Sequence, residues 1–365
     1  MSLPLRRVCD DWPRVLCPAP GCLMPTAPVM QRERVLHLSR RNRNQMQVGL
    51  ARAFQRIALR YEIVDFAMTP MCSVADNLLY AASHLAPTLV WMQLQQDPEV
   101  ITPALLRRLR GTCASNVVIV CWDGDQHFEP RAWQRAWFVD LGREFDAAFV
   151  KNTAHPYEYA ALGVRRPGYL GQGADCDALR PVVPTPAGVP EVVFVANHNA
   201  AVGRYTHRIE IAARLKDAYG DRCGIYGRNW GARGNGSVTE ADQPRLYSGA
   251  RASLSVSIRA DLPRYTSNRL LNILACGGVA LVERFPDCAG LGLVDGENCL
   301  LWTTWDELVE RTEWALYAPQ AATDALRAAA YALSAEHSWT AYMGQLLAVV
   351  DTIRAERAAA LGAAC

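Results

Sequence analysis

The sequence predicts an α/β protein with two doubly wound domains, each a parallel sheet covered by helices on both faces. Three observations support this prediction. Apolar strand-like runs alternate with helix-like stretches, a proline-rich segment interrupts the alternation, and the alternation then begins again. The chain of 365 residues is also long enough to bury two separate cores.

Five short apolar runs are the predicted strands of the first sheet. They are continuously apolar, which is typical of parallel strands buried on both faces. Helix-like stretches separate them, among them "QMQVGLARAFQRIALR", "VADNLLYAASHLA" and "PALLRRLRG". The predicted strands are residues 34–39, 61–66, 88–95, 116–122 and 147–150.

The segment "LRPVVPTPAGVP", residues 179–190, holds four prolines in twelve residues and has no apolar period, so it is the predicted linker. Strand-like runs resume at 191–197, 223–227, 252–257 and 279–283. The predicted domains are 1–178 and 191–335, followed by a final helix, 336–365, that can cross back to the first domain. In such folds ligands bind at the carboxyl ends of the strands, so the two sheets should face a shared cleft.

Composition indicates a cytoplasmic protein. No run approaches the roughly 18 uncharged apolar residues of a membrane span. The first residues, "MSLPLRRVCDDWPRVLC", lack the apolar core of a signal peptide. The twelve cysteines include no Cys-x-x-Cys pair, which favours reduced thiols. Cys9, Cys17 and Cys22 cluster, but they lack the ligand spacing and the fourth ligand of a zinc site.

One basic segment stands out against a net charge of only +2. Residues 31–60 contain eight arginines and one acid, Glu33. Arg40, Arg41 and Arg43 directly follow the first predicted strand, so they should lie at the mouth of the cleft. Such a patch is suited to a polyanionic partner. The alternative is a solvated helix face in a protein that uses arginine almost to the exclusion of lysine.

The stretch "YTSNRLLNILACGGVALVE", residues 265–283, is suited to binding phosphate. Thr266 or Ser267 can cap the apolar helix that follows, whose first turn presents free N–H groups and the positive end of the helix dipole. Arg269 adds a cation there, and a diphosphate fits this combination. Gly277 and Gly278 allow the helix to stop and the next strand to start at once. The same pattern also describes an ordinary helix-to-strand connection.

The run from "YSGARASLSVS" through this helix to "LVDGENCLLWTTWDELVERTEWALYAP" resembles the C-terminal half of glycosyltransferases with two Rossmann-like domains, the GT-B fold. The nearest branch is the one similar to spore maturation protein B (CgeB-like). Its typical features correspond to Ser267–Arg269, to Ala275–Gly278 and to the pair Gly296 and Glu297. "CGIYGRNW" and "YLGQGADCDALRP" resemble two further segments of that family.

The resemblance implies that the second domain binds a nucleotide-sugar, with a UDP-sugar such as UDP-glucose first among the donors. Tyr226, Gly227 and Trp230 would shape the base pocket, although Trp230 is equally suited to a core. Arg204 or Arg208 would hold the leaving phosphate. The residues assigned to the donor are Asn197, His198, Arg204, Tyr226, Gly227, Trp230, Ser267, Asn268, Arg269, Asn272, Gly277 and Gly278.

Asn272 is a departure from the family, which usually has a glutamate there to accept hydrogen bonds from the ribose hydroxyls. Asparagine keeps a carbonyl acceptor but loses the charge. Three alternatives follow: weaker ribose binding, a different donor, or a relative that binds a nucleotide or sugar without catalysis.

"WDGDQH", residues 122–127, places Asp123 and Asp125 at the end of the fourth strand. Acidic pairs of this kind hold a metal in other glycosyltransferases, but here the pair belongs to the domain opposite the donor. We therefore expect no obligatory metal or other cofactor. Asp123 and Asp125 are the candidate catalytic carboxylates, as a general base for the acceptor hydroxyl or as its positioning partner. An ordinary strand-end turn is the alternative.

The predicted function is glycosyl transfer to an acceptor hydroxyl held by the first domain. If the arginines at 40, 41 and 43 bind phosphates, the acceptor is DNA with a hydroxylated base, which must be flipped out of the duplex. Viral enzymes of this fold that glycosylate modified bases make this acceptor consistent with the resemblance, and the location would then be the host cytoplasm. A polysaccharide, a protein or a small metabolite are the other acceptors, and no membrane partner is expected.

Overall fold

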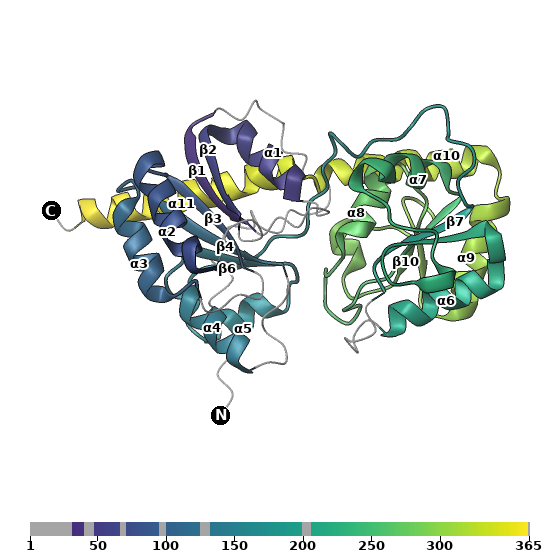
Figure 1. Ribbon diagram of the computed structural model, residues 1–365, viewed down its shortest axis with the longest axis horizontal. Helices are drawn as coiled ribbons and strands as arrows, with labels where there is room; N and C mark the ends of the chain where they lie inside the picture. The colour runs from purple at the N-terminus through teal and green to yellow at the C-terminus, as the bar shows by residue number, and fades with distance from the viewer. Residues whose placement is uncertain are drawn as a thin grey trace.

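The computed structural model describes residues 31–39, 47–65, 71–94, 100–124, 132–198 and 206–363. These residues form two α/β domains, each with a parallel sheet between two layers of helices (Figure 1). The predicted fold class is confirmed.

The sheet of the first domain has six parallel strands in the order β2-β1-β3-β4-β5-β6. β1 is paired on both sides, with Val35 opposite Tyr61 of β2 and Leu89 of β3. The chain therefore changes its direction of winding at β1, the topology of a doubly wound sheet. The strands are β1 (Glu33–Ser39), β2 (Ala58–Asp65), β3 (Leu89–Leu94), β4 (Val118–Asp123), β5 (Ala147–Val150) and β6 (Pro167–Tyr169).

Alternating side chains of these strands form two cores. Ile119 and Cys121 of β4 face one layer of helices, whereas Val118, Val120 and Trp122 face the other. The first layer consists of α2 (Met71–Leu85), α3 (Pro103–Thr112), α4 (Ala132–Gly142) and α5 (His155–Ala161). The second consists of α1 (Gln47–Ile57) and α11 (Trp339–Gly362), which comes from the far end of the sequence.

β2 begins three residues earlier than the sequence pattern predicted. The pattern continued the preceding helix to Arg60, but α1 ends at Ile57 and the strand starts directly at Ala58. Pairing with β1 explains the difference, because Arg60 lies opposite Arg34 in the sheet. Ladder hydrogen bonds formed there outweigh the local helical preference.

The sheet of the second domain has five parallel strands in the order β11-β10-β9-β7-β8, and its winding reverses between β7 and β9. α6 and α9 cover one face, while α7, α8 and α10 cover the other. The strands are β7 (Val192–Val195), β8 (Cys223–Tyr226), β9 (Ala252–Ser255), β10 (Ala280–Glu283) and β11 (Leu300–Trp302). The helices are α6 (Thr206–Tyr219), α7 (Gln243–Gly249), α8 (Asn268–Ala275), α9 (Trp305–Tyr317) and α10 (Gln320–Glu336), with short 3₁₀ turns at Gly220–Arg222, Gly231–Arg233, Glu240–Asp242 and Cys288–Leu291.

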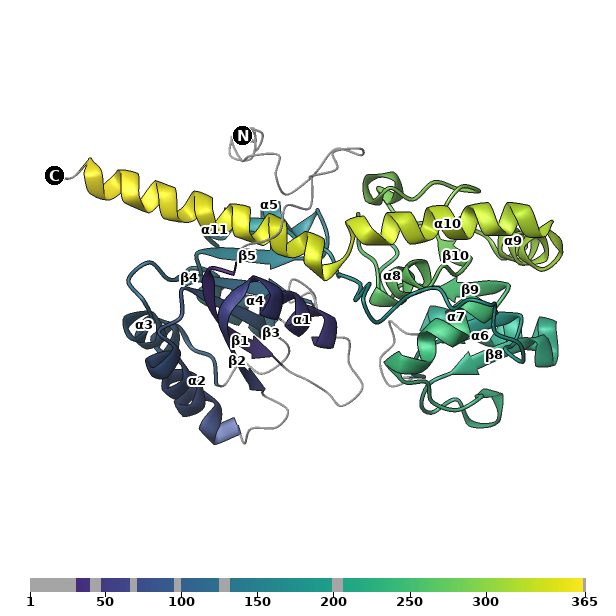
Figure 2. The same ribbon diagram turned by 90° about the horizontal axis from the view of Figure 1, so that it is seen from above.

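The chain passes between the domains twice, and the two passages lie side by side. Ala174, on the way out, pairs with Ser338, on the way back. The Ala174 N–H donates to the His337 carbonyl at 2.9 Å, and the Trp339 N–H donates to the Ala174 carbonyl at 3.0 Å. Figure 2 shows α10 on the second domain and α11 continuing from it along the first.

Ion pairs fix α11 to the first sheet. Arg354 donates to both carboxylate oxygens of Glu33 at 2.8 Å, and Thr88 donates to the same carboxylate at 2.7 Å. Glu33 is 1% exposed. Its burial raises the pKa of the carboxyl, but the hydrogen bonds from Arg354 and Thr88 outweigh burial and the net pKa is lowered. Arg357 forms a second pair of this kind, with Asp146.

Candidate functional site

The crevice between β7 and β9 is where the strand order of the second sheet reverses, the usual ligand site of such a sheet. The guanidinium of Arg269 bridges the ends of these two strands. Its Nε donates to the Val195 carbonyl at 2.5 Å and its Nη1 donates to the Val256 carbonyl at 2.9 Å. The guanidinium also lies 4.9 Å from the centroid of the Phe194 ring. Arg269 thus lies at the base of this crevice.

Arg208, in the first turn of α6, adds a second buried cation beside Arg269. Its Nη2 donates to the Asn197 carbonyl at 3.2 Å. Burial, together with the positive charge of Arg208, lowers the pKa of Arg269 to about 9. No carboxylate of the described residues contributes to that shift. Two guanidiniums that are close together and away from water favour an anion between or above them.

Two helix N-termini meet at the same place, those of α6 and α8. Ser267 is the N-cap residue of α8, as predicted, but its side chain accepts no bond from the first turn of the helix. Its hydroxyl instead lies 3.5 Å from Nη1 of Arg269. Ser267 and Asn268 are both half-exposed. The helix dipole of α8 is therefore available to a ligand at this edge.

Asn272 lies one turn further along α8 and is buried. Its Nδ2 donates to Oε1 of Gln243, the first residue of α7, at 2.8 Å. The amide therefore connects α8 to α7, a contact that the sequence pattern did not indicate. Gly277 and Gly278 end the helix: Gly277 has φ of +61°, and a Cβ at Gly278 would lie 2.8 Å from Ile273 Cγ2. These two glycines shape the turn into β10, away from the N-terminus of α8.

The loops that follow β7 and β8 bring five predicted donor residues together. Asn197 Oδ1 accepts the Arg228 N–H at 3.0 Å, and the His198 N–H donates to the Arg228 carbonyl at 2.9 Å. Gly227 has φ of +134°, and a Cβ there would lie 2.1 Å from the Ala196 carbonyl oxygen, so only glycine fits.

Trp230 supports these loops from the inside. It is 7% exposed, its Nε1 donates to the Ala196 carbonyl at 2.6 Å, and its ring meets that of His198 edge-on at 5.0 Å. Asn197 is exposed, and His198 and Tyr226 are half-exposed. These three side chains, rather than the indole, form the surface of the pair of loops.

Asp123 ends β4 in the first domain and is fully buried. It continues the side of the strand that carries Ile119 and Cys121, so it faces the helices α4 and α5. The Tyr159 hydroxyl of α5 donates to its Oδ2 at 3.5 Å. Burial raises the pKa of Tyr159, and the charge of Asp123 raises it further. Asp125 and Arg204 lie outside the described residues. The pairing of Asp125 with Asp123, and the contact of Arg204 with the leaving phosphate, therefore stay predictions.

The domains meet where β5 ends and the loop after β9 approaches α8. The Thr153 N–H donates to the Pro263 carbonyl at 3.2 Å. The Lys151 ammonium lies 4.6 Å from the centroid of the Tyr265 ring. The described carboxyl edges of the two sheets therefore face each other at this contact. No motif marked Lys151 or Tyr265 in the sequence, because the contact joins residues more than one hundred positions apart.

Four described arginines of the basic segment are engaged within the fold, although three of them, Arg32, Arg52 and Arg56, are exposed. Arg32 pairs with Asp351 at 2.8 Å, and Arg34 donates to the Ala86 carbonyl at 2.7 Å. Arg52 pairs with Asp175 at 2.5 Å, and Arg56 pairs with Asp177. These four arginines hold the fold together. A polyanion patch then depends on Arg40, Arg41 and Arg43, which lie outside the described residues.

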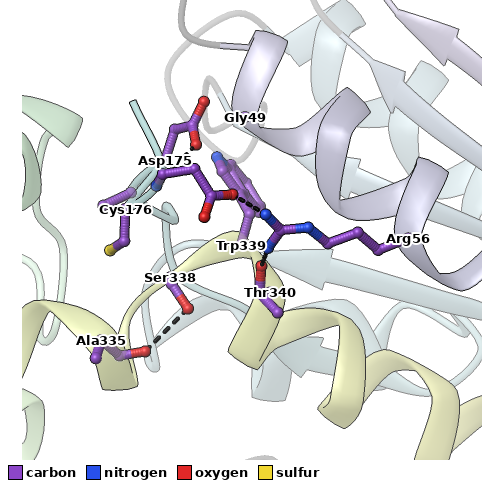
Figure 3. Close-up of a pocket in the computed structure, with 10 residues that line it drawn as sticks. Gly49, Arg56, Asp175, Cys176, Ala335, Ser338, Trp339 and Thr340 are labelled. Atoms are coloured by element: carbon purple, nitrogen blue, oxygen red, sulfur yellow. Dashed lines mark hydrogen bonds and ion pairs between the residues drawn. The ribbon is translucent and has the colours of Figure 1, made fainter. Parts of the chain in front are cut away.

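A hollow of about 180 Å³ lies beside the two interdomain passages. Arg56 points into it from α1 and donates to Thr340 Oγ1 at 2.8 Å (Figure 3). Asp175 and Cys176 line it from the outgoing passage, and Ser338 lines it from the returning one. Its walls are the elements that join the domains, so it belongs to the junction and not to the donor crevice.

Comparison with known proteins agrees with the fold. A family model described as glycosyl transferase-like matches residues 208–348. Among solved structures, HepE of Anabaena with UDP and glucose aligns with a TM-score of 0.60 at 12% identity, covering 91% of this chain and 100% of that chain. No curated protein sequence matches the chain.

Two further structures share the fold. A UDP-forming trehalose-phosphate synthase from Burkholderia xenovorans has a TM-score of 0.59 at 12% identity, covering 88% of this chain and 99% of that chain. An alpha-glucosyltransferase in complex with UDP-glucose and DNA has a TM-score of 0.61 at 10% identity, covering 88% of this chain and 100% of that chain. The chain therefore has the two-domain GT-B fold of these structures, and residues 208–348 carry the match to the glycosyl transferase-like family model.

In the part of the chain that the structure describes, no helix is long and apolar enough to cross a membrane. No group of three or more His, Cys, Asp or Glu side chains there is arranged to hold a metal ion.

Proposed function

We propose that the protein transfers a hexose from a UDP-sugar to an acceptor hydroxyl. The observation that carries the proposal is the pair of buried arginines, Arg208 and Arg269, at the reversal point of the second sheet. No carboxylate of the described residues contributes to the pKa shift of Arg269. A diphosphate placed there gains two cations and two helix N-termini at once. Structures with the same fold hold UDP or UDP-glucose.

We infer the following roles for such a reaction. Arg269 and Arg208 would stabilise the negative charge that develops on the leaving diphosphate as the glycosidic bond breaks. The exposed Asn197 and half-exposed Tyr226 lie where the base would be held, and Asn268 lies at the helix end. Asp123 and Asp125 would be on the acceptor side. The motifs around Ser267–Arg269 further suggest a place among enzymes similar to spore maturation protein B.

Calorimetry on the purified protein tests the donor site. UDP should bind, and Arg269→Ala should weaken it by about five- to 150-fold, the loss of one charge-assisted hydrogen bond of roughly 1–3 kcal/mol. Lys216→Ala is the matched control, because Lys216 binds carbonyls at the opposite end of α6. Absence of binding for UDP, ADP and GDP, or equal affinity in the Arg269 variant, would remove the proposal.

Transfer should not require a divalent metal. Asp123 belongs to the first domain, whereas the diphosphate would lie in the second, where arginines and helix termini supply the positive charge. Turnover measured as UDP release should be unchanged by EDTA. Loss of turnover with EDTA, restored by manganese, would show that a metal takes part.

DNA with a hydroxylated base is the acceptor we propose to test first. The fold is shared with an alpha-glucosyltransferase solved with UDP-glucose and DNA. Binding to duplex DNA should weaken steeply with salt, and an Arg40/Arg41/Arg43→Ala variant should show a slope shallower by about three. Exposed arginines elsewhere provide the matched triple control, Arg107/Arg143/Arg233→Ala. Equal slopes in the two triple variants would return Arg40, Arg41 and Arg43 to a solvated surface, and no binding at low salt would exclude DNA as the acceptor.

A further inference from the structure

Lys151 belongs to the first domain, but its ammonium group contacts the second domain. It is the first residue after β5, and its side chain is 9% exposed. Its ammonium lies over the ring of Tyr265, which is itself buried. Tyr265 stands two positions before Ser267, the N-cap residue of α8. The lysine therefore approaches the same helix end that presents Arg269.

The backbone holds this contact in register. The Thr153 N–H donates to the Pro263 carbonyl across the domains. Asn152 Oδ1 accepts the N–H groups of Ala154 and His155 at 3.0 and 2.9 Å, which fixes the loop between Lys151 and α5. Both ends of the contact thus belong to ordered segments, and only the long side chain of Lys151 needs to move.

The choice of lysine is informative in this chain. The sequence has 36 arginines and only two lysines, Lys151 and Lys216. Lys216 caps the carboxyl end of α6 through the Gly220 and Cys223 carbonyls, a structural role. An ammonium on a flexible stem can leave an aromatic face for a phosphate oxygen more easily than a planar guanidinium that is held by two parallel bonds.

We propose that Lys151 is the first domain's contribution to the donor diphosphate. When a nucleoside diphosphate occupies the crevice at Arg269, the Lys151 ammonium moves from the Tyr265 ring to the terminal phosphate. The diphosphate then connects the two domains, and the monophosphate, which lacks that terminal group, does not. The inference rests on the proposed function, since it requires a nucleoside diphosphate at the N-terminus of α8.

The test compares UDP with UMP in the full-length protein by calorimetry. Lys151→Met keeps the stem and removes the charge. This substitution should lower the affinity for UDP by about tenfold or more and leave the affinity for UMP unchanged. Lys151→Arg keeps the charge, so it should lose less UDP affinity than Lys151→Met. Lys216→Met should change the affinity for neither ligand. Circular dichroism and thermal melting identify which variants are folded.

The possible results separate this inference from the proposed function. If UDP binds and Arg269→Ala weakens it, but folded Lys151→Met binds UDP as the wild type does, then the Lys151 assignment is wrong and the donor site stands. An equal loss for UDP and UMP would also overturn it, because it indicates a structural role. If the wild type binds none of the nucleoside diphosphates, both proposals fail.

Discussion

The two domains use arginines at their sheets in opposite ways. On the first sheet, Arg354 and Arg357 each meet a buried carboxylate, Glu33 and Asp146. At the edge of the second sheet, Arg269 donates to backbone carbonyls and has another cation, Arg208, as its electrostatic neighbour. In the first set each arginine faces an opposite charge. Arg269 differs, because the charged group that shifts its pKa most is another cation.

This difference distinguishes arginines that hold the fold from those that serve a ligand. A buried ion pair is costly to break because one charge then stays buried without a partner. Arg269 already bears the cost of desolvation and has a cation as its charged neighbour. Its removal should therefore reduce the free energy of unfolding little and ligand affinity strongly. The two sets therefore predict opposite results for the same kind of substitution.

The largest effect on stability is expected at α11. Arg354→Ala leaves the Glu33 carboxylate buried without its bidentate partner, so the free energy of unfolding should fall by about 3–5 kcal/mol. Urea denaturation of the wild type and the variant measures this difference in the free energy of unfolding. The double variant Arg354→Met with Glu33→Gln should recover most of the loss, since no charge is then left buried. A fall below about 1 kcal/mol in the single variant would mean that the pair is not part of the structural core.

Arg269 should show the opposite behaviour. Without ligand, Arg269→Met should change the free energy of unfolding by less than about 1 kcal/mol, because a buried charge and its desolvation cost disappear together. UDP at one hundred times its Kd should stabilise the wild type by about 2.7 kcal/mol. At that concentration it should stabilise the variant, whose Kd is about five- to 150-fold higher, by about 0.3–1.8 kcal/mol. Strong destabilisation of the variant without ligand would place Arg269 with the structural arginines.

The smallest effect concerns His337, a half-buried group at the interdomain passages. Its Nε2 bonds the Leu291 carbonyl at 3.0 Å and its Nδ1 bonds the Tyr342 hydroxyl at 2.9 Å. Burial lowers the pKa of His337 below its usual 6.5. The unfolded chain then takes up the proton at higher pH than the folded protein does. Stability should therefore fall as pH drops below about 6.5.

His337→Gln should reduce this pH dependence, as measured by urea denaturation between pH 7.5 and 5.5. His84 is exposed on α2, so His84→Gln serves as the control and should leave the dependence as it is. The same slope in the wild type and in His337→Gln would show that other groups account for it.

Local patterns predicted much of the fold and part of the site. Continuous apolar runs predicted the strands, and the sequence from Thr266 to Arg269 predicted a helix start with a cation beside it. The three-residue strands β6 and β11 gave no such signal, because so short a run has no period. The pairing of Arg354 with Glu33 joins residues 321 positions apart, and the contact of Lys151 with Tyr265 joins two domains. Such long-range contacts form only when the whole chain is folded, so no local sequence motif predicts them.

The return of α11 to the first domain has a consequence for the order in which the chain acquires structure during synthesis. One face of the first sheet, with Trp91, Trp122 and Phe149, has no complete cover until α11 has been made. The second domain's strands and the helices α6 to α10 are finished before that point. At ~5–20 residues per second, the first-made domain waits on the order of tens of seconds for its last helix. The domain that begins first should therefore be completed last, and its uncovered tryptophan face is where a chaperone would be needed on the ribosome.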